Sequence, residues 1–203
     1  MKRTFFSLAL LLAVATLTAQ TKMTAREAAV KIADRILAST TYEFKNTKTG
    51  EIYKSVKKLP LDMDVKVACK YNNWHYTNGV TNMALMELGD KLGDKKYEKY
   101  VLKNMNFVFN EGNLDFFRKQ YDEAFKRDGW NAVRKLSWHM IFRGKRLDDN
   151  GPMGASLIEL QLKYPNDSFL GYINETAEHL NYGEPRLVDG TIARIWPHVN
   201  TIW

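Results

Sequence analysis

The 203-residue chain contains a single cysteine, Cys69, which excludes an intramolecular disulfide and a cysteine metal cluster. We expect Cys69 to be a small, partly buried apolar residue. The four histidines lack the spacing of metal ligands. The sequence also has no glycine-rich phosphate loop, no serine-centred nucleophile elbow and no cofactor fingerprint, so we expect neither a metal nor an organic cofactor.

Long apolar runs are also missing, apart from one short run at the N-terminus. Lys2 and Arg3 precede an apolar run over residues 5–17 that is too short to span a bilayer, and a cleavage point lies at Ala19-Gln20. This pattern predicts a signal peptide over residues 1–19 and a periplasmic or secreted protein with no stable membrane anchor. The alternative is that the run stays as a permanent anchor. No cysteine follows it, which argues against a lipid anchor.

The formal net charge is +7, and acidic residues are interspersed among the basic ones. Such a mixture is typical of a solvated surface. A mild positive field suits an anionic substrate. No nucleic-acid recognition motif accompanies the charge, so we do not expect a nucleic-acid partner.

Apolar residues recur with helical periods along most of the remaining chain, which is about 184 residues long and sufficient for one domain over 20–203. Thr24 and Glu27 form a capping box before the first stripe. A break near Asp128-Gly129 divides the helical stretch over 114–141. Four further stripes cover residues 80–88, 97–108, 153–164 and 169–180.

Two segments depart from the helical pattern. Residues 45–72 contain glycine, proline and short alternating runs, which predicts a long loop or a hairpin. The Asp189-Gly190 pair lies between residues 186–188 and 191–195 and predicts a β-hairpin near the C-terminus.

The helical stripes form two hairpins related by an offset of 72 residues. Nine pairs of residues match at this offset: Asn78 with Asn150, Gly79 with Gly151, Leu85 with Leu157, Glu87 with Glu159, Leu88 with Leu160, Asp94 with Asn166, Tyr97 with Phe169, Tyr100 with Tyr172, and Val101 with Ile173. Repeated helical hairpins build a solenoid or a closed α/α-toroid. The alternative is a chance match of two ordinary amphipathic hairpins. In a toroid, equivalent loops open on the same end, so residues 74–79 and 146–149 should line one mouth.

Two adjacent carboxylates, Asp148 and Asp149, lie immediately before a predicted helix. Near aromatic surface, a carboxylate is suited to acid/base chemistry because its charged form is disfavoured. The alternative is that both are helix caps, favoured by the helix dipole.

Aromatic residues of the second loop suit a sugar ring. Trp74 and Tyr76, together with His75, can form a stacking platform with hydrogen-bonding groups at its edge. The alternative places these aromatic residues in the core, and Trp203 has the same ambiguity. Arg194, which follows the Asp189-Gly190 turn, is a candidate for bidentate binding of an acidic sugar or else an exposed strand residue.

Five segments in this order, WHYTNGV, LGDKKYEKYV, RLDDNGPMGASLIEL, DGTIARIWP and TIW, resemble the unsaturated glucuronyl and rhamnogalacturonyl hydrolases of glycoside hydrolase families 88 and 105. The likeness covers nearly all of the chain after the signal peptide and is closer to family 105. It implies an (α/α)6-barrel and an enzyme of pectin degradation. The implied substrate is an oligosaccharide with an unsaturated uronic acid at its non-reducing end. An aspartate protonates the vinyl ether, water adds to the C4=C5 bond, and the resulting hemiketal opens without any cofactor.

The resemblance assigns roles to particular residues. Asp149 matches the family's first active-site aspartate, with Asp148 as its neighbour, and Trp74 and Tyr76 match the aromatic loop at the mouth. Arg194 lies near a basic residue of the family, although the spacing is loose. Trp203 matches the tryptophan of a Trp-x-Asp motif whose aspartate, the main general acid/base, would follow two residues later.

Twelve helices with their loops need about 250 residues or more. We therefore expect an incomplete barrel of helical hairpins, a truncated chain that exposes apolar helix faces and has no hydrolase activity alone. The competing hypothesis is an exported, non-enzymatic α/α-repeat protein that binds an acidic glycan or a protein partner.

Overall fold

The computed structural model describes residues 23–142, 147–195 and 200–202, and helices predominate among them. The chain divides into two compact units, Met1–Arg35 and Ile36–Trp203. The predicted signal peptide lies outside the described residues. Among the residues that are described, no helix is long and apolar enough to cross a membrane.

The capping box predicted in the first unit is confirmed. The Thr24 amide donates to Glu27 Oε2 at 2.8 Å, and the Glu27 amide donates to Thr24 Oγ1 at 3.2 Å. These bonds satisfy two amide groups that have no intrahelical partner, and helix α2 (Ala25–Ser39) begins there.

The second unit contains two helical hairpins. Helices α3 (Tyr76–Leu92) and α4 (Lys96–Val108) form the first, and α6 (Leu147–Lys163) and α7 (Asp167–Glu178) form the second. Their turns are capped alike: Asp94 accepts from the Lys96 amide at 3.0 Å, and Asn166 accepts from the Ser168 amide at 2.9 Å. The 72-residue repeat therefore extends to the capping bonds.

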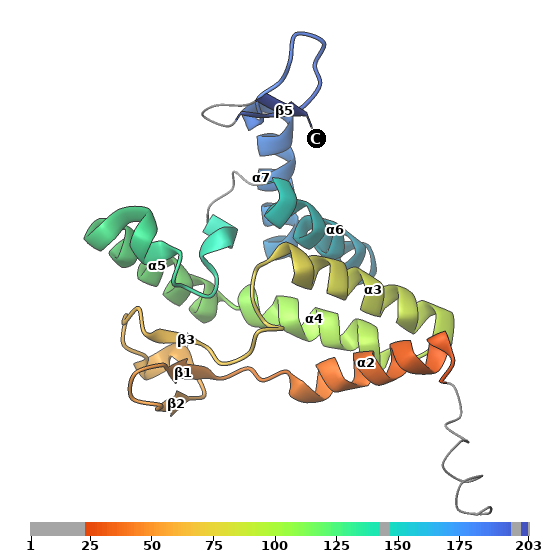
Figure 1. Ribbon diagram of the computed structural model, residues 1–203. Helices are drawn as coiled ribbons and strands as arrows, with labels where there is room; N and C mark the ends of the chain where they lie inside the picture. The colour runs from red at the N-terminus through yellow and green to blue at the C-terminus, as the bar shows by residue number, and fades with distance from the viewer. Residues whose placement is uncertain (1–22, 143–146, 196–199, 203) are drawn as a thin grey trace, which may run out of the picture. The chain divides into compact units, whose positions relative to one another are not determined.

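Helices α3 and α6 lie side by side and run parallel (Figure 1). At their C-terminal ends, Lys163 Nζ lies 3.2 Å from Asp90 Oδ1. At their N-terminal ends, Gly79 contacts Pro152. Both pairs are separated by 73 residues along the chain, close to the repeat offset. The repeat is therefore a physical stacking of equivalent helices, as the sequence predicted.

The core between the hairpins is built from equivalent residues. Leu85 and Leu157 are buried, and so are Tyr97 and Phe169. The buried residues of each helix lie on one face, as a stripe with a 3.6-residue period requires.

Residues 45–72 contribute three short strands, joined by loops, to a small antiparallel sheet in the order β2-β1-β3, so the segment combines the predicted hairpin with the predicted loop. The strands are β1 (Phe44–Asn46), β2 (Ile52–Tyr53) and β3 (Val65–Val67), and the 3-10 turn η1 covers Val56–Lys58. Buried Phe44 packs against the rings of Phe116 and Phe117 at 5.9 and 6.0 Å. This contact attaches the sheet to helix α5 (Glu111–Val133).

Helix α5 is interrupted at Asp128 and Gly129, where the sequence predicted a break. Gly129 has φ +50°, a value that favours glycine. The 3-10 turn η2 (His139–Phe142) precedes α6, and a π-helical turn, η3 (His179–Gly183), follows α7.

The β-hairpin predicted around Asp189-Gly190 is confirmed only as a turn. The Leu187 amide donates to the Thr191 carbonyl at 2.8 Å, and a single bridge pairs Arg186 with Ile192. The Ala193 amide also donates to the Pro185 carbonyl at 2.8 Å, and Pro185 has no N–H to donate in return. The regular strands are instead β4 (Ala193–Ile195) and β5 (Asn200–Ile202), which pair with each other.

Candidate functional site

The N-terminal ends of α3 and α6 meet at a contact that requires glycine. A β-carbon at Gly79 would overlap the backbone of Pro152 and lie 2.5 Å from the Met153 nitrogen. The first turns of the two helices therefore touch through their backbones. This contact brings the loop before α3 next to the start of α6, as the toroid argument predicted.

Trp74 is buried at this junction, so its predicted role as a stacking platform is wrong. Its side chain is 0% exposed and packs edge-on against the Tyr172 ring at 4.9 Å. Its Nε1 donates to Asn150 Oδ1 at 3.2 Å. An aromatic face without solvent exposure cannot stack on a sugar ring, so Trp74 is a core residue.

The asparagines of the repeat hold this junction together. Buried Asn150 accepts a second hydrogen bond from the Tyr172 hydroxyl at 3.0 Å. Burial raises the pKa of the Tyr172 phenol, which keeps the donor protonated. Asn78 donates to the carbonyls of Lys70 and Asn73 at 3.0 and 2.9 Å. The asparagine shared by both repeats, Asn78 and Asn150, therefore holds a loop in the first hairpin and buried aromatic residues in the second.

His75 and Tyr76 remain available to a ligand. His75 is the N-cap of α3, and its Nδ1 accepts from the Thr77 amide at 3.4 Å. Tyr76 is 46% exposed, and its ring lies 4.6 Å from the imidazole with an interplanar angle of 36°. Capping holds the imidazole in place, and the imidazole contacts the exposed phenol.

The adjacent carboxylates occupy the first turn of α6 rather than the loop before it. The helix begins at Leu147, which places both Asp148 and Asp149 within it. Asp148 is half-buried, and its Oδ1 is out of contact with solvent. The side chain of Asp149 lies outside the described residues. The first turn suits carboxylates because the helix dipole favours negative charge there.

The side chains of two further predicted binding residues, Arg194 and Trp203, lie outside the described part of the structure. Arg194 belongs to β4, where its backbone pairs with Thr201, but its side chain lies outside the described residues, as does the whole of Trp203. Cys69 is buried, as expected, and its thiol contacts the Ser39 carbonyl oxygen at 3.7 Å. In the described ranges, no group of three histidine, cysteine or acidic residues could hold a metal ion.

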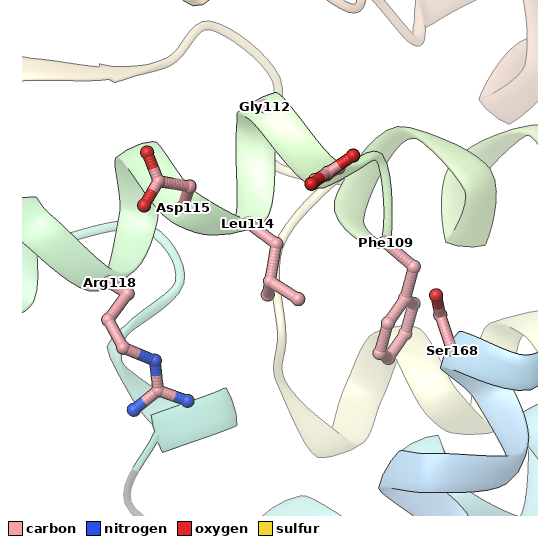
Figure 2. Close-up of a pocket in the computed structure, with 7 residues that line it drawn as sticks. Phe109, Gly112, Leu114, Asp115, Arg118 and Ser168 are labelled. Carbon is pink, nitrogen blue, oxygen red and sulfur yellow. The ribbon is translucent and has the colours of Figure 1, made fainter.

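A second region, a hollow lined by charged and polar side chains, was not predicted from the sequence. An open hollow of about 810 Å³ lies along the first half of α5 and reaches the start of α7 (Figure 2). Its lining combines two carboxylates, one guanidinium, one hydroxyl and apolar groups, from residues Phe109, Glu111, Gly112, Leu114, Asp115, Arg118 and Ser168. The sequence could not predict it, because α5 and α7 are distant in sequence.

Comparison with models of known protein families and with curated proteins found no match to this chain. The chemistry of the junction is therefore inferred from the residues that form it. An exposed aromatic ring, an imidazole and carboxylates at adjoining helix starts can bind a sugar ring and exchange protons with it.

Proposed function

We propose that this protein is a glycoside hydrolase-like protein of the (α/α)6-barrel type that acts on unsaturated uronyl oligosaccharides from pectin. The supporting observation is the junction of the parallel helices α3 and α6. The exposed ring of Tyr76 and the imidazole of His75 lie at the start of α3. The close contact at Gly79 places this helix end against the first turns of α6, which contain Asp148 and Asp149.

The stacking of two helical hairpins supports the barrel type. A toroid consists of parallel inner helices, each followed by an antiparallel outer helix, and α3 and α6 have that relationship. Both helices also leave apolar side chains exposed, among them Val80, Met83, Ile158 and Leu162. Such faces are expected of an incomplete barrel.

The substrate fits the chemistry of this mouth. The C4=C5 double bond flattens a uronic acid ring, and a flattened ring suits the face of Tyr76. Asp149 is the supporting carboxylate, and no residue of this chain matches the main proton donor of families 88 and 105. Arg194 would bind the uronate carboxylate.

Binding of an unsaturated galacturonyl–rhamnose disaccharide to the 203-residue chain tests the proposal by titration calorimetry. We expect Tyr76→Ala to weaken binding by about fivefold, because an aromatic contact contributes about 1 kcal/mol. Tyr182→Ala is the matched control, since Tyr182 is 85% exposed on η3. Absence of binding, or equal effects of the two variants, would overturn the proposal.

Turnover is tested separately, by the ultraviolet absorbance of the double bond. The chain is expected to bind without hydrolysing, because none of its residues matches the main proton donor of the family. Hydrolysis by this chain would contradict that assignment. The alternative is a non-enzymatic glycan-binding repeat protein, and hydrolysis would contradict that alternative as well.

A further inference from the structure

We propose that the hollow beside α5 is a binding site for a carboxylate-bearing sugar, and that Arg118 binds the carboxylate. The hollow does not depend on the hydrolase proposal, since none of its lining residues belongs to the junction of α3 and α6. Its volume of about 810 Å³ falls within the range of small-molecule sites, which is about 300–1,000 Å³.

The Arg118 guanidinium is held for recognition by an aromatic ring. Its Cζ lies 4.3 Å from the centroid of the Phe142 ring. The Phe142 ring in turn packs edge-on against Tyr121 at 5.6 Å. Stacking occupies the flat face of a guanidinium and leaves its in-plane N–H groups to donate, and this geometry matches a carboxylate in two parallel bonds.

The nearest carboxylates of the hollow do not neutralise this cation. Asp115 Oδ2 forms an ion pair with Lys119 Nζ at 2.6 Å. Figure 2 shows the Asp115 carboxylate directed away from the Arg118 guanidinium, on the other side of α5. Arg118 is exposed and makes no ion pair within the described part of the chain, so its guanidinium is accessible to a ligand carboxylate.

The other end of the hollow differs in chemistry. Figure 2 shows Phe109 and Ser168 there, with the Leu114 side chain between them and Arg118. The Ser168 amide donates to its own helix cap, Asn166, at 2.9 Å, and the adjacent side-chain hydroxyl is exposed. A ligand that spans the hollow thus meets a cation, an apolar patch and a hydroxyl in turn.

These groups select a hydroxylated acid over a simple anion. Glu111 and Asp115 also line the hollow, and two carboxylates repel an anion that has nothing to donate. Sugar hydroxyls donate to carboxylates, while the C–H face of a sugar ring suits the half-buried side chain of Leu114. A uronic acid offers all three functions, because it combines one carboxylate, several hydroxyls and an apolar face.

Titration with sodium D-galacturonate, at fixed ionic strength and followed by amide NMR, tests this site. We expect shifts at Gly112, Arg118 and Ser168, and weaker binding of D-galactose, the counterpart without a carboxylate. Arg118→Gln should weaken galacturonate binding by about tenfold or more, because a hydrogen bond to a charged group contributes about 1.5–3 kcal/mol. Arg118→Lys should restore part of the affinity, since it keeps the charge and loses the planar fork.

Lys103→Gln is the matched control, because it removes a cation that also lies over an aromatic ring, Tyr42, at 4.3 Å. Its affinity should equal that of the unaltered protein. Failure to bind galacturonate, equal affinity for galactose, or equal losses in the Arg118 and Lys103 variants would overturn the proposal. Circular dichroism of each variant establishes that its fold is retained.

The two proposals can fail independently. Tyr76→Ala should leave galacturonate shifts at α5 unchanged. If galacturonate instead shifts amides at the start of α3 and α6 and leaves α5 unaffected, the hollow is refuted and the junction is supported. If the unsaturated disaccharide does not bind while galacturonate shifts α5, the hydrolase proposal fails alone.

Discussion

The substitution Gly79→Ala tests the contact that brings the two halves of the candidate site together. An alanine β-carbon would lie 2.5 Å from the Met153 nitrogen, which is 0.9 Å short of the 3.4 Å at which ordinary contacts begin. Because the opposing atoms are backbone, no side-chain rotation can relieve the overlap. Helices α3 and α6 would have to separate at their N-terminal ends.

The magnitude follows from two opposing contributions. Overpacking of this kind costs about 1–3 kcal/mol, whereas replacing a helical glycine by alanine contributes about 1 kcal/mol of stability. The difference between the two contributions is a destabilisation of Gly79→Ala by up to about 2 kcal/mol. Gly171→Ala is the matched control, because Gly171 lies in α7, is exposed, and has no atom within 4 Å of the added carbon. It should be stabilised by about 0.5–1 kcal/mol.

The assay is urea unfolding followed by far-ultraviolet circular dichroism. The midpoint of Gly79→Ala should fall below that of the unaltered protein, and the midpoint of Gly171→Ala should rise above it. If the two variants are equally stable, the close approach of α3 and α6 is wrong. The shared mouth of the candidate site would then lose its structural basis.

Two further predictions concern residues around the same helices. Glu98 is buried and accepts hydrogen bonds from Lys163 Nζ at 2.6 Å and the Tyr164 hydroxyl at 2.5 Å, and these partners, Lys163 first, lower its pKa. Its stabilising contribution should be present above the ordinary pKa of 4.5 and decrease as pH falls through the lowered value. The free energies of unfolding of Glu98→Gln and the unaltered protein, measured with urea, should therefore differ by about 1–2 kcal/mol at pH 7 and converge in acid. Trp74→Phe should cost about 1–2 kcal/mol, by loss of the bond to Asn150 and of ring volume, yet leave sugar affinity unchanged by calorimetry. A loss of affinity without a loss of stability would restore Trp74 as a ligand platform.

Local patterns in the sequence predicted the helices and their order well. The capping box at Thr24, the break at Gly129 and the turn at Asp94 all depend on bonds or backbone angles within a few residues. Such features follow from residue types at short spacing. The repeat extended the prediction to tertiary structure, because equivalent helices of stacked hairpins lie side by side.

Side-chain burial was harder to predict than helix position. Trp74 and Tyr76 are two residues apart in the same motif, yet one is 0% and the other 46% exposed. The sequence gives both the same aromatic character. The difference arises from Asn150 and Tyr172, which meet Trp74 only in the folded chain. The hollow beside α5 was missed for the same reason, since Ser168 joins Arg118 across 50 residues of sequence.

The two carboxylates at the start of α6 can stabilise the end of the helix, act on a ligand, or do both. Asp148 and Asp149 lie in the first turn of α6, where the dipole alone favours acidic residues. In α3, the equivalent positions hold Tyr76 and Thr77, so the fold does not require acids at this point of a hairpin. Helix α3 is capped by His75 instead, and we propose that the acids of α6 take part in binding or proton transfer in addition to capping. This role is part of the function proposed for the junction of α3 and α6.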